Sequence, residues 1–288
     1  MLKKIFVAIF GLLILSSQTA AAVDWNSVPH FDNKAELARY IENGRRQGQT
    51  VFNFVLTNRT FSTNKEVAEK EAAALAEEFT NGVAFALKSN MVVGMGTGRV
   101  TYTITKEYPG TRVANAYLNG GTLSGDDWIL YQKALPIVNE AKKFSSPIDR
   151  ELYIHDEIIR RVDTFYNDET FFTEDNDNRR FITAMGVLID GKANCQGFAD
   201  TFYMLCRMTG LDVGRIGGTF GTASHVWNTI TFEDGKTYCV DVTNGFNTKS
   251  LYLFNAPLEI IQRSHSCQWD AIPNLQQTAD GRYGGNLK

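Results

Sequence analysis

Three residues whose side chains suit acyl transfer follow one another between positions 195 and 241. Cys195 is followed by His225 thirty positions later and by Asp241 sixteen positions after that. A thiol becomes a strong nucleophile when an imidazole takes its proton, and a third group must orient that imidazole. The sequence therefore predicts a thiol acyl-transfer site at Cys195, His225 and Asp241.

The segment after Cys195 has the periodicity of a helix, because its apolar residues recur at intervals of three and four. Asn194 indicates the start of this helix and Gly210 its end. Cys195 then lies in the first turn, where unpaired backbone N–H groups and the helix dipole stabilise a thiolate. The alternative is a buried structural cysteine, which is common for this residue type.

Residues 225–232 and 236–243 are rich in β-formers, and Asp234-Gly235 lies between them. This pattern predicts a β-hairpin. Because side chains alternate between the two faces of a strand, the length of the loop decides whether the histidine and the aspartate share a face.

Two hairpin registers are open. A two-residue loop places Asp241 on the face opposite to His225. A three-residue loop with Gly235 in the left-handed conformation pairs Phe232 with Lys236 and makes Asp241 a diagonal neighbour of His225. We predict the second register because it brings the imidazole and the carboxylate together.

These segments resemble the transglutaminase-like superfamily, whose core is a rearranged relative of the papain fold. The family pattern is Gly-x-x-Cys-x-Gly-Tyr-Ala, then His-x-Trp-Asn, then Asp-x-Thr. The matching segments are residues 192–199, 225–228 and 241–243. Further similarity at residues 154–159 and 183–191 extends the resemblance upstream. Downstream, residues 252–255 resemble the closing strand of the family and His265 resembles a late histidine, so the resemblance covers about residues 146–270.

The resemblance implies an α+β fold with a papain/transglutaminase-like core. In that core the catalytic cysteine begins a helix that packs on an antiparallel sheet bearing the histidine and the aspartate. It also implies a catalytic triad of Cys195, His225 and Asp241. The chain departs from the usual pattern at Asn194, where an apolar residue is common, and at Phe198, where tyrosine is common. The pair Asn244-Gly245 replaces a frequent Trp-Asp pair.

The implied activity is acyl transfer from protein or peptide amides through a thioester. Release by water makes the protein a cysteine peptidase or amidase, which we favour because water always competes. Release by a lysine amine makes it a transglutaminase that cross-links proteins. A third alternative is a catalytically silent module that binds peptide or cell wall, but an intact set of three catalytic residues argues against it.

The first 22 residues have the features of a secretory signal peptide. Lys3 and Lys4 precede an apolar run, and Ala20 and Ala22 provide a cleavage site after Ala22. The apolar run is too short to span a bilayer comfortably, although a retained anchor is the alternative. We therefore expect a secreted or extracytoplasmic protein with no transmembrane segment after signal removal and with cell-envelope association left open.

The composition argues against several kinds of partner. The chain has 29 basic and 32 acidic residues and no basic stripe, so nucleic acid is not an expected partner. No metal or organic cofactor is expected. The acidic loop at residues 173–180 has side chains found in calcium sites, but it lacks the glycine and the final glutamate of a helix–loop–helix site.

The other three cysteines are Cys206, Cys239 and Cys267. An odd number of thiols cannot pair completely within one chain. A buried free thiol is the simplest reading of Cys206, and a disulfide between Cys239 and Cys267 is an alternative for an exported protein.

Together, the sequence patterns and the resemblance predict three regions. These are a signal peptide at 1–22, an N-terminal α+β region at 23–145 and a transglutaminase-like catalytic domain at 146–288. The glycine-rich segment 94–98 is expected to be a turn that leads into a strand. Expected helices cover residues 34–48, 63–80, 125–144 and 146–165, and expected strands cover residues 50–57, 99–107 and 111–118.

Overall fold

The computed structural model describes residues 23–79, 86–166, 179–281 and 283. The expected signal peptide and most of the acidic loop lie outside the described residues. Within the described ranges, no helix combines the length and the apolar character needed to cross a membrane.

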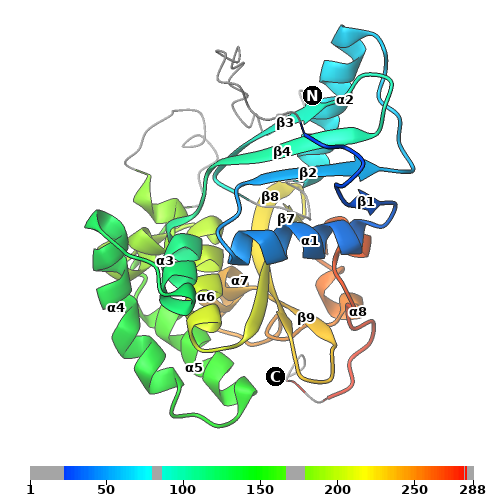
Figure 1. Ribbon diagram of the computed structural model, residues 1–288. Coiled ribbons are helices and arrows are strands. Elements are labelled where there is room, and N and C mark those ends of the chain that lie inside the picture. Colours follow the sequence, from blue (N-terminus) through cyan, green and yellow to red (C-terminus); the bar gives the residue numbers. More distant parts are fainter. Residues whose placement is uncertain (1–22, 80–85, 167–178, 282, 284–288) are drawn as a thin grey trace.

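A four-stranded sheet forms the N-terminal part of the molecule, at the top of Figure 1. Alternate residues of its strands, among them Phe52, Phe54 and Tyr102, point to one face and form an apolar core with two helices. The strands in sheet order are β1 (His30–Phe31), β2 (Val51–Leu56), β4 (Arg99–Lys106) and β3 (Lys88–Val93), and the helices are α1 (Lys34–Arg46) and α2 (Lys65–Glu78).

A second four-stranded, antiparallel sheet carries the C-terminal half. The helix α6 (Cys195–Met208) packs against β7 and β8 of this sheet. Figure 1 shows α3, α4 and α5 gathered around α6 on the same side. The strands in sheet order are β10 (His265–Ser266), β7 (Asp212–Phe220), β8 (Ala223–Thr231) and β9 (Thr237–Val240).

The largest apolar core lies between α6 and the helices around it. These helices are α3 (Pro109–Asn119), α4 (Gly125–Ala141) and α5 (Pro147–Arg160). Both α3 and α4 precede the expected boundary at residue 145, yet their apolar faces are buried in the same core as α5 and α6. The two halves of the chain therefore share a core.

Short elements complete the fold around the beginning of α6. A parallel pair of short strands, one turn of 3-10 helix (η3) and one turn of π-helix (η4) precede it in the chain, and two short helices follow β9. These elements are β5 (Thr164–Phe165), β6 (Lys192–Ala193), η3 (Arg180–Ile182), η4 (Gly186–Asp190), α7 (Val242–Thr248), α8 (Leu258–Ile261) and η5 (Trp269–Ala271).

The strand predicted at residues 111–118 is wrong, because these residues lie in the helix α3. Pro109 occupies the first turn of this helix, where its fixed φ and missing N–H cost nothing. Val113 and Ala114 are fully buried, and Tyr117, one turn after Val113, packs against the same core. The alternation of residue types fits either structure, and packing against α6 and α4 selects the helix.

Three other elements differ from expectation. The helix that begins at Pro147 ends at Arg160 rather than near 165, because the chain turns there to pair β5 with β6. The turn at 94–98 is confirmed, but it joins two strands, β3 and β4, of which only the second was expected. Residues 252–255 form turns rather than a closing strand, and only a single bridge joins Ala256 to Cys239.

Candidate active site

Cys195 is the first residue of α6, as predicted from the sequence. Asn194 precedes it in an extended conformation and accepts a hydrogen bond on Oδ1 from the Gly197 N–H at 3.1 Å. This side-chain cap satisfies one of the backbone donors that a helix leaves unpaired at its start. The Cys195 thiol is partly buried against a small cluster that includes Tyr108 and Val226.

The hairpin that follows has the predicted three-residue register. Gly235 has a φ of 77°, and Phe232 donates its N–H to the Lys236 carbonyl at 3.0 Å. Thr231 then lies opposite Thr237. A left-handed glycine is the feature that this hairpin type requires.

Asp241 reaches the site in a way that the predicted hairpin does not contain. The strand β9 ends at Val240 instead of continuing to residue 243, and α7 begins at Val242. Asp241 is the N-cap of that helix, and its Oδ1 accepts the Asn244 N–H at 3.1 Å. The carboxylate is therefore held by a helix start, which also favours its negative charge.

The other oxygen of Asp241 faces the imidazole of His225. His225 Nε2 lies 3.0 Å from Asp241 Oδ2, and the two side chains are 10% and 2% exposed. Burial raises the pKa of the Asp241 carboxyl, but the charges and hydrogen bonds of His225 and His265 outweigh it and hold this pKa well below its usual value. Burial lowers the pKa of His225, but Asp241 raises it more strongly, to about 10.

Cys195 lies within reach of the same imidazole. The Cys195 thiol is close enough to His225 to add to the rise of the His225 pKa. Because Asp241 occupies Nε2 of the ring, Nδ1 is the nitrogen left for the thiol. The structure thus brings together all three residues predicted from the sequence, with the imidazole between the thiol and the carboxylate.

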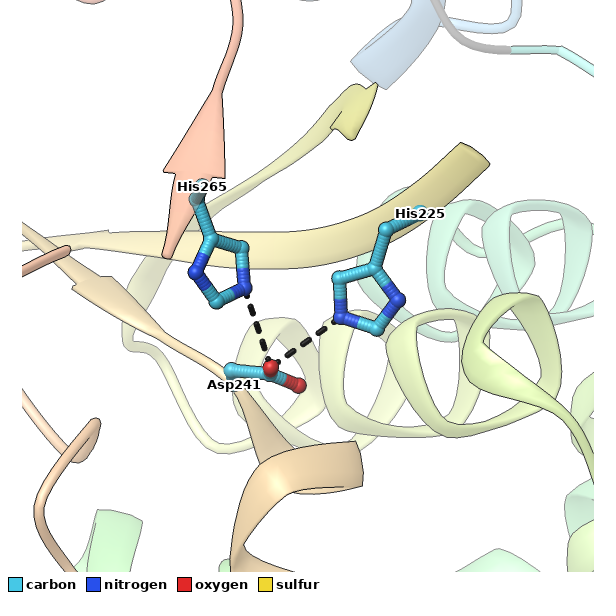
Figure 2. A group of neighbouring side chains, drawn as sticks. All are labelled: His225, Asp241 and His265. Carbon is cyan, nitrogen blue, oxygen red and sulfur yellow. Dashed lines mark hydrogen bonds and ion pairs between the residues drawn. The ribbon is translucent and has the colours of Figure 1, made fainter. Parts of the chain in front are cut away.

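A fourth residue, His265, joins the site and was not predicted as a site residue. Its Nε2 lies 3.1 Å from Asp241 Oδ2, and its Nδ1 lies 2.9 Å from Ser264 Oγ. Figure 2 shows the two imidazoles converging on one carboxylate oxygen. His265 belongs to β10, which pairs with β7, so only the pairing of distant strands brings it to the site.

The side chains of His225, Asp241 and His265 are also of types that bind transition metals. Their ligand atoms lie within 4.8 Å of one another. Nitrogen and carboxylate oxygen are suitable ligands for zinc, but a tetrahedral site needs a fourth ligand. Within the described part of the chain the group has three such residues, and Asp241 already bonds both imidazoles. The arrangement therefore fits a hydrogen-bonded catalytic group better than a metal centre.

The other cysteines lack the surroundings of a nucleophile. All four cysteines are free, so the alternative disulfide between Cys239 and Cys267 is wrong for this structure. Burial raises the pKa of Cys206 well above its usual value, as expected for an enclosed thiol. Burial also raises the pKa of Cys239, to about 12, and raises that of Cys267.

A buried charge cluster anchors the middle of α6 behind the site. Asp200, which is fully buried, accepts hydrogen bonds on Oδ2 from the backbone N–H groups of Gly110 and Ala184 at 3.1 and 2.9 Å. Its Oδ1 accepts a hydrogen bond from Arg215 Nη1 at 2.7 Å. The Arg215 guanidinium also lies 4.3 Å from the ring centre of Tyr108. These contacts connect α6, β7 and the beginning of α3 next to Cys195.

The family of this domain follows from its sequence. Residues 138–242 match the model of the transglutaminase-like superfamily, and this segment includes Cys195, His225 and Asp241. The chain therefore carries a transglutaminase-like domain of the α+β class. No curated protein matches the chain.

Solved structures with a related arrangement include a TGase, at 13% identity and a TM-score of 0.34 over 75% of this chain and 59% of that one. Another is the periplasmic domain of TgpA from Pseudomonas aeruginosa, at 11% identity and a TM-score of 0.34 over 54% of this chain and 59% of that one. A candidate cysteine protease from Cytophaga hutchinsonii has 15% identity and a TM-score of 0.31 over 54% of this chain and 61% of that one. The chain thus spans about six tenths of the length of each of these structures.

Proposed function

We propose that this protein is a thiol enzyme that hydrolyses amide bonds in proteins or peptides, with Cys195 as nucleophile, His225 as acid and base, and Asp241 as the group that orients the imidazole. The observation that carries the proposal is the 3.0 Å contact between His225 Nε2 and Asp241 Oδ2 beside a cysteine that begins a helix. A thiolate at a helix start next to an imidazole is the usual setting of a reactive cysteine.

In the proposed reaction His225 takes the thiol proton, and the Cys195 sulfur forms a bond to the carbonyl carbon of the substrate. The carbonyl π electrons move to oxygen, where backbone N–H groups at the start of α6 stabilise the negative charge. The C–N bond then breaks, the leaving nitrogen takes the proton from His225, and a thioester remains. Water attacks the thioester with His225 as base and releases the acid and the thiol.

Transfer to an amine is the second candidate, because the same residues can form the thioester. The matched superfamily is named for transglutaminases, which supports this alternative. The decisive experiment is mass spectrometry of a glutamine-containing protein incubated with the enzyme and a primary amine. We expect mostly acid product and a minority of amine adduct. Predominant adduct would assign the protein as a transglutaminase. The absence of both products would favour a catalytically silent binding module.

The identity of the nucleophile has a direct control. Iodoacetamide at neutral pH should label Cys195 ahead of Cys206, Cys239 and Cys267, and Cys195→Ala should remove both labelling and turnover. Persistent labelling of another cysteine with retained activity would contradict the assignment.

Activity should also survive a chelator, and activity lost on chelation and restored by calcium would show that the acidic loop has a metal role.

We also propose that the protein acts outside the cytoplasm after cleavage behind Ala22, so that its mature N-terminus is Val23. The order of charged, apolar and small residues at the N-terminus supports this. Intact mass of the protein recovered from its native host tests it, and a mass that retains residues 1–22 would contradict it. We further propose that residues 23–145 support the catalytic domain rather than act independently.

A further inference from the structure

Gln196, which directly follows Cys195, is held by a residue from the N-terminal region. The Tyr108 hydroxyl donates a hydrogen bond to Gln196 Oε1 at 3.3 Å, and both side chains are buried, at 1% and 7% exposure. An amide oxygen can only accept a hydrogen bond, so this contact determines which end of the Gln196 amide faces Tyr108. The amide nitrogen Nε2 is left at the other end.

Tyr108 is itself held rigidly. It is the residue before Pro109 at the start of α3, and its backbone N–H donates to Glu107 Oε1 at 2.9 Å. The guanidinium of Arg215 lies 4.3 Å from the centre of its ring and is anchored by the buried carboxylate of Asp200. A hydroxyl in such surroundings can keep a neighbouring amide in one orientation.

Two N–H donors at Cys195 and Gln196 have no partner among the residues that the structure describes. Within the described part of the chain, neither the Cys195 backbone N–H nor Gln196 Nε2 has a hydrogen-bond partner. Nε2 is also not among the enclosed polar atoms that lack a partner, so it keeps contact with solvent. Two adjacent residues, Cys195 and Gln196, therefore offer free N–H donors at the start of α6 within the described part of the chain.

From this arrangement we propose that Gln196 is a catalytic residue whose Nε2 donates to the oxyanion formed on the substrate, together with the Cys195 N–H, and that Tyr108 is a positioning residue that orients the Gln196 amide. This inference rests on the proposed thiol mechanism. When the sulfur–carbon bond forms, the electron pair of the carbonyl moves to oxygen and receives both hydrogen bonds. The charge is released again when the C–N bond breaks.

The test compares two reactions of the same thiol. Acylation by p-nitrophenyl acetate forms an oxyanion, and alkylation by iodoacetamide does not, so the ratio of their rates reports oxyanion stabilisation. Loss of one oxyanion donor slows acyl transfer by about 100-fold or more in well-studied enzymes. We expect Gln196→Met to slow the p-nitrophenolate burst by roughly 10- to 100-fold and to leave alkylation of Cys195 within about twofold.

Tyr108→Phe should slow the burst by a smaller factor, again without changing alkylation, because the amide loses its orientation but not its donor. Tyr203→Phe is the matched control. It also removes a hydroxyl from a buried tyrosine, one that donates to Glu42 at 2.6 Å, and it should leave the ratio unchanged. Gln196→Leu also lacks the donor, adds no charge beside the thiol, and replaces Gln196→Met if that variant does not fold.

An unchanged ratio in the Gln196 variants would overturn the proposal. A larger loss in Tyr108→Phe than in Gln196→Met would also overturn it, because it would make the tyrosine hydroxyl the donor. If the unmodified protein shows neither a burst nor alkylation of Cys195, the thiol mechanism fails and the inference fails with it. A burst that does not depend on Gln196 is a different result, because it would overturn only the role of Gln196 and leave the thiol mechanism in place.

Discussion

At the scale of single residues, Asp241 has two tasks that its two oxygens perform separately. Oδ2 bonds the imidazoles of His225 and His265, and Oδ1 caps α7 through the Asn244 N–H. Asparagine caps helices as well as aspartate does, so Asp241→Asn removes the charge while it preserves the start of the helix. This separation makes the substitution a clean test of the carboxylate.

We expect Asp241→Asn to lower kcat/KM for a peptide amide by about 100-fold or more. The pH dependence should change as well. Departure of the amine needs a protonated His225, whose pKa stands at about 10 mainly because Asp241 outweighs the effect of burial. Without the carboxylate charge the His225 pKa falls. The loss of activity on the alkaline side of the pH profile should therefore begin at a lower pH than in the unmodified protein. Rate profiles between about pH 6 and 10 measure this, and a fully active variant with an unmoved alkaline limb would reduce the site to a cysteine–histidine pair.

At the scale of elements, α5 buries a carboxyl group that has one hydrogen bond. Glu151 is fully buried and accepts a hydrogen bond on Oε2 from Asn255 Nδ2 at 3.0 Å, while Oε1 has no partner among the residues that the structure describes. Burial raises the pKa of Glu151 to about 8, although the Asn255 bond acts against this, whereas the ordinary value is 4.5. A neutral carboxyl is therefore favoured inside the fold.

This raised pKa predicts the direction of a pH effect on stability. Between pH 4.5 and about 8 the unfolded chain has released the Glu151 proton and the folded chain retains it, so the free energy of unfolding falls as pH rises through this window. Glu151→Gln removes the cost and should stabilise the protein at pH 8 by up to a few kcal/mol relative to wild type, with little gain near pH 5. Urea unfolding at both pH values measures this. Glu77→Gln, at an exposed position of α2, is the control, and an equal effect of Glu151→Gln at both pH values would refute the prediction.

At the scale of the whole molecule, the N-terminal half and the C-terminal half are joined by buried charge and by a shared core. Arg45 of α1 makes two hydrogen bonds to Glu107, at 2.9 and 2.7 Å, and Arg215 of β7 lies 3.7 Å from the same carboxylate, so the buried charges cross the boundary at residue 145. Breaking a buried ion pair on one side leaves an uncompensated charge, which costs about 3–5 kcal/mol. The buried apolar residues that α3 and α4 add to the shared core are Val113, Ala114, Leu130, Ala134, Ile137, Val138 and Ala141.

A fragment of residues 146–288 should therefore fail to fold independently. It contains Cys195, His225 and Asp241, but it lacks α3 and α4 and would expose the core that they cover. We expect the fragment to show no cooperative thermal transition and weak near-ultraviolet circular dichroism, with the chain from residue 23 as the reference. Cooperative unfolding of the fragment would mean that the expected domain boundary at 145 marks an independent unit.

Local patterns allowed the helix start at Cys195 and the hairpin to be predicted. The start of α6 at Cys195 depends on neighbours in the sequence, and the register at Gly235 depends on the preference of glycine for a positive φ. Residues 111–118 show where this approach fails. Their alternation fits a strand as well as a helix, and contacts with distant helices make the choice.

The sequence by itself thus determined the helix start at Cys195 and the hairpin turn after His225, because helix starts and tight turns are set by a few adjacent side chains. Only the tertiary structure placed His265 against Asp241 and Tyr108 against Gln196. His265 arrives through pairing between β10 and β7, and Tyr108 arrives from a segment 88 positions before Gln196. Contacts of this kind form when distant apolar surfaces are buried together, and the sequence around either residue carries no signal of its partner.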